Sequence, residues 1–230
     1  MITDSIQQRS LSWFRARMGH ITGSRVADIM KCGRKKDEPW SDTAKSYLYQ
    51  VAAERLFNPG FLSDDDVFQD YLAQTSVSTR AMQWGSEQED AAKSLFMRLR
   101  FPDGELSDLS SCRHDTIPHF AASPDGMVCV RGGGGLRVLE VKCPGLNTYM
   151  KYRSIIHDAA SLKDAEPKYY WQMMAEMSCT GTGGGFFIAY CPWLTKPIHW
   201  AEIERVEDDI ALMEQRVILA NKFIDEIINN

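Results

Sequence analysis

A stretch of the chain around residues 121–144 limits the possible folds more than any other part of the sequence. It reads AASPDGMVCVRGGGGLRVLEVKCP, which is two apolar segments joined by a run of glycines. This pattern predicts two neighbouring strands of a core sheet. Yet Asp125 opens the first strand, and Glu140 and Lys142 lie inside the second. A fold that contains this segment must therefore accept two carboxylates and an ammonium at or near its core.

The second strand, LRVLEVKCP, separates its charged and apolar residues by alternation. Because side chains alternate between the two faces of a strand, Glu140 and Lys142 share one face with Val138. The other face takes Leu139, Val141 and Cys143. An exposed ion pair explains an isolated Glu-x-Lys, but the rest of this strand has the composition of a buried one. Pro124 and Gly126 constrain the turn around Asp125. We therefore expect Asp125 and Glu140 to converge, with Lys142 beside them.

Two carboxylates that lie close together repel each other unless one is protonated or a cation lies between them. Mg²⁺ prefers such oxygen ligands. A divalent cation held in this way can neutralise a phosphate, activate water and stabilise the leaving oxygen in phosphodiester hydrolysis. A lysine beside it can orient or deprotonate the water, or balance charge on the phosphate. The segment therefore predicts a metal-dependent phosphodiesterase site.

Two predicted helices offer further polar groups to this site. In the helix over residues 80–100, helical spacing places Glu89 on the apolar face, where it can serve as a third carboxylate ligand. A partly buried glutamate held by a salt bridge explains the same pattern equally well. In the helix over residues 167–179, Gln172 can hydrogen-bond a phosphate or the attacking water. The alternative for Gln172 is a core amide with its hydrogen bonds satisfied.

The order of the predicted elements indicates the fold class. Helices occupy the first 100 residues; strands follow near 109–117, 119–130 and 136–143, then helices over 147–160 and 167–179, two strands, and a helix over 207–228. This order predicts an α/β (α+β) fold with a central mixed β-sheet flanked by helices. We expect one domain over residues 1–230, with a helical part at 1–100, a sheet core at 105–205 and a C-terminal helix at 207–228.

Three local predictions complete this outline. A short helix before Gly19 is followed by a second helix capped near Thr22. The polar, acidic residues 58–79 are expected to form a flexible connection. The last helix has a narrow apolar seam, which favours packing on its own sheet over a contact between subunits.

The distribution of charge is more informative than its sum. The net charge is −5, but residues 9–36 contain eight Lys or Arg and one acid, Asp28. This basic stretch suits a surface that meets phosphates, although solvated surface is the simpler explanation. The six cysteines are scattered without a CxxC pair, which predicts reduced thiols in a cytoplasmic protein and argues against a zinc or iron–sulfur site. No apolar run is long enough to span a bilayer, so no membrane association is expected.

A series of short motifs runs in order along the chain between Trp13 and Glu204. They are W-x3-R, ITGS, WG-x3-E, SPDG, LEVKCP and Y-x-Q. In this order they resemble the lambda-type phage 5′→3′ exonucleases, the YqaJ-like viral recombinase family of the PD-(D/E)xK nuclease superfamily. The resemblance implies a restriction-endonuclease-like nuclease core.

The resemblance also implies a role for individual residues. Glu89, Asp125 and Glu140 match the family's metal-binding acids, with the backbone carbonyl of Val141 as a further ligand of Mg²⁺, which Mn²⁺ can replace. Lys142 matches the catalytic lysine and Gln172 the glutamine of a conserved motif. The residues that match the family's binding pocket for the 5′-phosphate of DNA are Arg17, Ser24 and Ser123.

The function implied by the resemblance is Mg²⁺-dependent 5′→3′ degradation of one strand of linear double-stranded DNA. The products are 5′-mononucleotides and 3′ single-stranded overhangs for annealing-type recombination. Partners would be DNA ends, a homotrimer ring and a single-strand annealing protein in the bacterial or phage-infected host cytoplasm. Two alternatives stay open: an endonuclease of restriction or repair type, and a non-catalytic DNA-binding module of the same fold. The acidic segment SDDDVFQD departs from the lambda pattern and has no role in this scheme.

Overall fold

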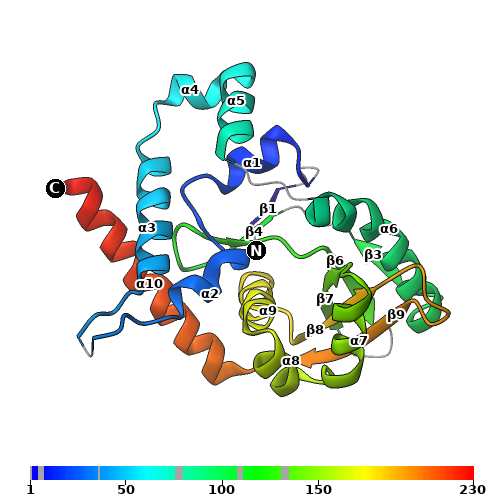
Figure 1. Cartoon of the computed structure of the whole chain (residues 1–230). Coiled ribbons are helices and arrows are strands. Elements are labelled where there is room, and N and C mark those ends of the chain that lie inside the picture. The colour runs from blue at the N-terminus through cyan, green and yellow to red at the C-terminus, as the bar shows by residue number, and fades with distance from the viewer. Residues whose placement is uncertain (1, 5–7, 36, 76–79, 108–110, 131–134) are drawn as a thin grey trace.

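The structure is a computed structural model that describes residues 2–4, 8–35, 37–75, 80–107, 111–130 and 135–230. A five-stranded sheet forms its centre, with the strand order β3-β6-β7-β8-β9. Its strands are β3 Glu105–Ser107, β6 Gly126–Val130, β7 Gly135–Lys142, β8 Gly184–Tyr190 and β9 Ile198–Glu204. Within this sheet the β7–β8 pair is parallel, and the β3–β6, β6–β7 and β8–β9 pairs are antiparallel. The predicted mixed sheet flanked by helices is confirmed (Figure 1).

A second, smaller sheet lies beside the first and has the order β1-β4-β5-β2. Its strands are β1 Ile2–Asp4, β4 Ser111–Arg113, β5 Phe120–Ala122 and β2 Ile21–Thr22. The single strand predicted over residues 119–130 is therefore wrong, because β5 and β6 belong to different sheets. Pro124 lies between them and has no N–H to donate to a ladder, so the strand ends there. Asp125 consequently lies where the two sheets meet.

The helices surround the sheets (Figure 1). They are α1 Leu11–Arg17, α2 Val26–Ile29, α3 Asp42–Arg55, α4 Pro59–Ser63, α5 Asp65–Thr75, α6 Arg80–Arg100, α7 Leu146–Ile155, α8 Ala159–Ala165, α9 Pro167–Thr180 and α10 Glu207–Asn229, with a 3₁₀ turn η1 Gly23–Arg25. Local signals account for several of their beginnings. The Ser41 side chain accepts from the N–H of Ala44 and caps α3, while Pro167 occupies the first turn of α9.

One local prediction is wrong, and another is confirmed in position only. The supposed flexible connection over residues 58–79 contains α4 and α5, because Asn58 caps α4 and aromatic residues on both helices pack together. Thr22 occupies the N-cap position of η1, as predicted, but its side chain makes no capping bond; Thr22 pairs with β5 and its N–H donates to the Tyr47 hydroxyl at 2.9 Å. The helical turn begins only at Gly23.

Helices α6 and α9 pack on opposite faces of the central sheet. Val138 of β7 belongs to the core that includes Met173 of α9, while Leu139 and Val141 pack in the core of Phe96 on α6. The predicted alternation along β7 is thus confirmed. The seam of α10 is buried within the chain at Ile210, Met213, Val217, Ala220 and Ile224. It packs on helices α3, α9 and α2, so the predicted packing on the sheet is wrong.

Two further observations concern membrane-spanning helices and the state of the cysteines. In the described ranges, no helix combines the length and the apolar character that crossing a membrane requires. All six cysteines are free thiols in the structure.

Candidate active site

The structure brings Asp125, Glu140 and Lys142 together at the end of β7. The Asp125 N–H donates to the Leu139 carbonyl at 3.0 Å, and Asp125 Oδ2 accepts from the Val141 N–H at 2.7 Å. These two bonds hold Asp125 alongside β7 on either side of Glu140. Glu140 is fully buried, and its Oε1 forms an ion pair with Lys142 Nζ. The local geometry is therefore the one expected from the SPDG turn and the strand alternation.

The electrostatics of this cluster favour a bound cation. Burial and the neighbouring Glu140 raise the pKa of Asp125 well above its ordinary value. Burial lowers the pKa of Lys142, but Glu140 and Asp125 outweigh it, so the pKa of Lys142 is raised and the side chain stays an ammonium. Glu140 Oε1 is paired with the Lys142 ammonium, whereas Glu140 Oε2 accepts no hydrogen bond from any residue that the structure describes. A buried carboxylate oxygen without a donor, with a raised carboxyl pKa nearby, fits a hard divalent ion.

Glu176 of α9 is a fourth charged member of this cluster that the sequence analysis did not assign. It is fully buried, and its Oε1 accepts from Gln172 Nε2 at 3.0 Å. Its Oε2 has no hydrogen-bond partner in the described part of the chain. Burial and then the carboxylates of Glu140 and Asp125 raise the pKa of Glu176 well above its ordinary value. The available signal was the four-residue spacing from Gln172, which places both side chains on one helix face.

Glu89 lies near this cluster but faces other partners. Its carboxylate pairs with Arg9 at 2.7 Å and with Lys93 at 3.5 Å. Lys93 also donates to the Asp125 carbonyl at 3.2 Å, which links α6 to the turn. The salt-bridged arrangement left open from the sequence is the one observed. Across the described ranges, no three His, Cys, Asp or Glu side chains are already arranged around one metal position.

Arg17, Ser24 and Ser123 form a second polar site. Arg17 Nη1 donates to Ser123 Oγ at 2.7 Å, and Nη2 lies 3.5 Å from Ser24 Oγ. The guanidinium stacks on Trp13, one helical turn earlier, at 4.3 Å from the ring centre. Burial lowers the pKa of Arg17 to about 10, which still leaves it cationic at neutral pH. Within the described residues no carboxylate forms an ion pair with Arg17, and a half-buried cation of this kind suits an anionic ligand.

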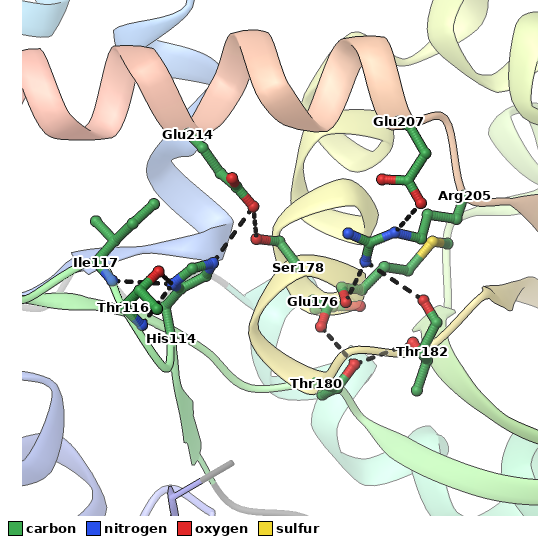
Figure 2. Close-up of polar contacts among 11 residues, drawn as sticks. His114, Thr116, Ile117, Glu176, Ser178, Thr180, Thr182, Arg205, Glu207 and Glu214 are labelled. Atoms are coloured by element: carbon green, nitrogen blue, oxygen red, sulfur yellow. Dashed lines mark hydrogen bonds and ion pairs between the residues drawn. The ribbon is translucent and has the colours of Figure 1, made fainter.

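The helix that carries Gln172 and Glu176 is fixed at its C-terminal end (Figure 2). Ser178 Oγ donates to Glu214 Oε1 of α10 at 2.7 Å, and Thr180 Oγ1 donates to the Glu176 carbonyl at 2.7 Å. Arg205, which follows β9, donates to the Met177 carbonyl at 2.7 Å. The bonds of Ser178 and Arg205 join α9 to α10 and to the segment after β9, while the bond of Thr180 lies within the last turn of α9.

Comparison with known proteins agrees with this architecture. Residues 12–183 match the YqaJ-like viral recombinase domain. The alkaline exonuclease LHK-Exo from Laribacter hongkongensis is 27% identical, with a TM-score of 0.72 over 96% of this chain and 95% of that one. The same exonuclease in complex with dAMP is 28% identical over the same shares, again with a TM-score of 0.72.

A phage-related exonuclease from Haemophilus somnus 129PT shares the fold, with a TM-score of 0.67, 16% identity and coverage of 91% and 95%. No curated protein sequence matches the chain. The fold and the likeness to exonucleases define the protein as a nuclease. Because the domain match covers well over half of the chain, the protein belongs to the YqaJ-like viral recombinase family. The predicted family is thereby confirmed, and the prediction of a deoxyribonuclease is supported.

Proposed function

We propose that this protein is a Mg²⁺-dependent 5′→3′ exodeoxyribonuclease that degrades one strand of linear double-stranded DNA. It releases 5′-mononucleotides and leaves 3′ single-stranded overhangs for annealing-type recombination. The observation that carries the proposal is the cluster of Asp125, Glu140 and Lys142 around the fully buried Glu140, whose Oε2 lacks a hydrogen-bond donor in the described chain. The fold of an alkaline exonuclease supports it.

Asp125, Glu140 and the backbone carbonyl of Val141 would hold the Mg²⁺ ion or a substituting Mn²⁺. Glu89 would join them once its carboxylate leaves Arg9. A bound divalent ion supplies charge neutralisation at the phosphate and a lower pKa for the attacking water. Carboxylates suit this role because hard cations such as Mg²⁺ prefer oxygen ligands.

The protein's own side chains perform the remaining tasks. Lys142 is held beside Glu140 and over the Tyr169 ring, with its nitrogen 4.9 Å from the ring centre. From there its ammonium orients the attacking water or balances charge on the phosphate. Gln172 binds the water or a phosphate oxygen, with its amide held in place by Glu176.

Arg17, Ser24 and Ser123 would bind the 5′-terminal phosphate. A terminal phosphate offers several acceptor oxygens to a guanidinium fork and two hydroxyls. Ser123 and Asp125 are two residues apart, so an end held at Arg17 leaves the next phosphodiester near the carboxylates. This arrangement would give the 5′→3′ direction. The complex of LHK-Exo with dAMP, a nucleoside monophosphate, is consistent with such a site.

Assembly and location are proposed from the family resemblance. A homotrimer ring around DNA would keep the enzyme on one strand, and a single-strand annealing protein would receive the 3′ overhang. Both would act in the bacterial or phage-infected host cytoplasm.

Digestion of end-labelled linear duplexes with and without Mg²⁺ tests the proposal. We expect Mg²⁺-dependent loss of nucleotides from 5′ ends only. Cutting of covalently closed circles would favour an endonuclease of restriction or repair type. Nuclease activity that survives Lys142→Ala and Asp125→Ala would refute the site, and no activity under any condition would favour a non-catalytic DNA-binding module.

A further inference from the structure

A pocket of about 220 Å³ adjoins Arg17 among α1, α3 and α5. Arg17 and Ser24 of the proposed phosphate site form part of its wall, together with the rings of Phe14, Tyr47 and Tyr71. The wall residues that the structure describes include none of the cluster carboxylates. The pocket therefore extends from Arg17 toward the helices and not toward the proposed cleavage site.

Helix α5, which begins within the acidic segment SDDDVFQD, contributes Tyr71, Leu72 and Thr75 to the wall of this pocket. Figure 1 shows α4 and α5 next to α1 and close to α3. Arg15 of α1 ties them down, because its Nε donates to the Leu62 carbonyl at 2.6 Å and its guanidinium lies 4.8 Å from the centre of the Phe68 ring. Tyr71 packs edge-on against Phe57 at 5.1 Å. Helices α4 and α5 therefore form a packed unit, which holds Tyr71 in the wall of the pocket.

The pocket has the chemistry of a nucleoside site. The rings of Phe14 and Tyr71 can contact the face of a base, and the amide of Gln50 and the hydroxyl of Thr75 on the pocket wall can bond a base edge or a sugar hydroxyl. The face of Tyr47 is covered by Arg25. Base stacking on aromatic side chains tolerates any sequence. The volume equals the liquid share of about seven water molecules at ~30 Å³ each, which is room for a planar base. Arg17 at its inner end supplies the cation for the adjoining phosphate.

We propose that this pocket receives the 5′-terminal nucleoside of DNA strands that lack a terminal phosphate. The inference rests on the proposed exonuclease function. With a 5′-phosphorylated end, the terminal phosphate occupies Arg17 and the first phosphodiester faces the carboxylates. With a 5′-hydroxyl end, Arg17 has a phosphate partner only after the strand advances by one nucleotide. The terminal nucleoside then occupies the pocket, the first internal phosphate reaches Arg17, and the second phosphodiester faces the carboxylates.

The first products therefore differ between the two ends. Water attacks the second phosphorus and the 3′-oxygen of the second nucleotide leaves. This releases a dinucleoside monophosphate with a 3′-hydroxyl, while the shortened strand carries a new 5′-phosphate. Every later step releases a 5′-mononucleotide, because the strand now has a terminal phosphate for Arg17.

A labelled phosphate between the first and second nucleotides of a 5′-hydroxyl duplex decides the matter. We expect the label to appear first in the dinucleoside monophosphate. Leu72→Trp, which narrows the pocket from α5, should lower the initial rate on 5′-hydroxyl ends relative to 5′-phosphate ends about tenfold, as expected for losing ~1.4 kcal/mol of stacking. Gln69→Trp, on the exposed side of the same helix and outside the pocket wall, should leave this ratio unchanged.

Three results would overturn the inference. They are label released only as a mononucleotide, no attack on the 5′-hydroxyl end, and equal effects of the two tryptophan variants on the ratio. Each leaves the proposed function standing if the phosphorylated duplex is degraded. Failure to hydrolyse either duplex would overturn both proposals.

Discussion

Asp125→Asn should make the metal-free protein more stable while removing its nuclease activity. The cluster contains three carboxyl groups, of Asp125 and the fully buried Glu140 and Glu176, against the single ammonium of Lys142. An asparagine oxygen can keep the bond that Asp125 Oδ2 accepts from the Val141 N–H. The substitution therefore removes one repelling charge without leaving that donor unpaired.

The size of the effect follows from the cost of uncompensated buried charge. Repulsion between like charges that share one site is about 1–4 kcal/mol at an effective dielectric constant of about 20, and in a chain of this size each ~1 kcal/mol shifts Tm by about 2–4 °C. In EDTA we expect Asp125→Asn to raise Tm by about 2–16 °C. Asp103→Asn, an exposed acid far from the cluster in sequence, is the matched control and should leave Tm unchanged.

The pH dependence gives the same prediction an independent test. The pKa values of Asp125 and Glu176 are raised in the folded protein, so the folded state holds protons that the unfolded state has already lost. Their contribution to stability is therefore lost as the pH rises above about 4 toward the raised values. The gain from Asp125→Asn should be smallest near pH 4 and grow with pH, as followed by thermal unfolding. A gain that is absent, or that shrinks as the pH rises, would refute the reasoning.

Three further outcomes are expected. Arg17→Ala should lower the preference for 5′-phosphate over 5′-hydroxyl ends about tenfold or more, since a charge-assisted hydrogen bond contributes about 1.5–3 kcal/mol; an unchanged ratio of initial rates would contradict the role of Arg17. Lys142→Ala should lower kcat by about 100-fold or more, with an unchanged far-ultraviolet circular dichroism spectrum, in single-turnover assays. Glu176→Ala should release the amide of Gln172 and lower kcat about tenfold with little change in KM; Glu176→Gln, which keeps a hydrogen-bonding side chain, should recover part of the loss, and equal losses in the two variants would argue against positioning.

The central part of the site could be predicted because its geometry is local. Alternation along β7 places Glu140 and Lys142 on one face, and the SPDG turn directs Asp125 toward the same strand. Each of these two inferences depends only on residues within about one turn or one strand. The N-cap at Ser41 and the position of Pro167 in the first turn of α9 follow from local sequence for the same reason.

The parts that were missed depend on contacts between distant segments. Glu176 belongs to the cluster because α9 packs across one face of β7, and a helix pattern does not say which sheet face it will cover. Glu89 pairs with Arg9, eighty residues earlier in the chain. The acidic composition of residues 58–79 hid an aromatic core made by Phe61, Phe68 and Tyr71, so helices were mistaken for a connection.

In the exonuclease proposed above, the link between the two sheets sets the distance between the bound DNA end and the cleaved phosphodiester. Ser123 at one end of the link contacts Arg17, and Asp125 at the other contacts β7. Two residues of extended chain span at most about 7 Å, so covalent geometry limits how far the end anchor lies from the point of cutting. Inserting a single glycine into the link would change the distance between the Arg17 site and the carboxylates, while leaving both sets of side chains in place.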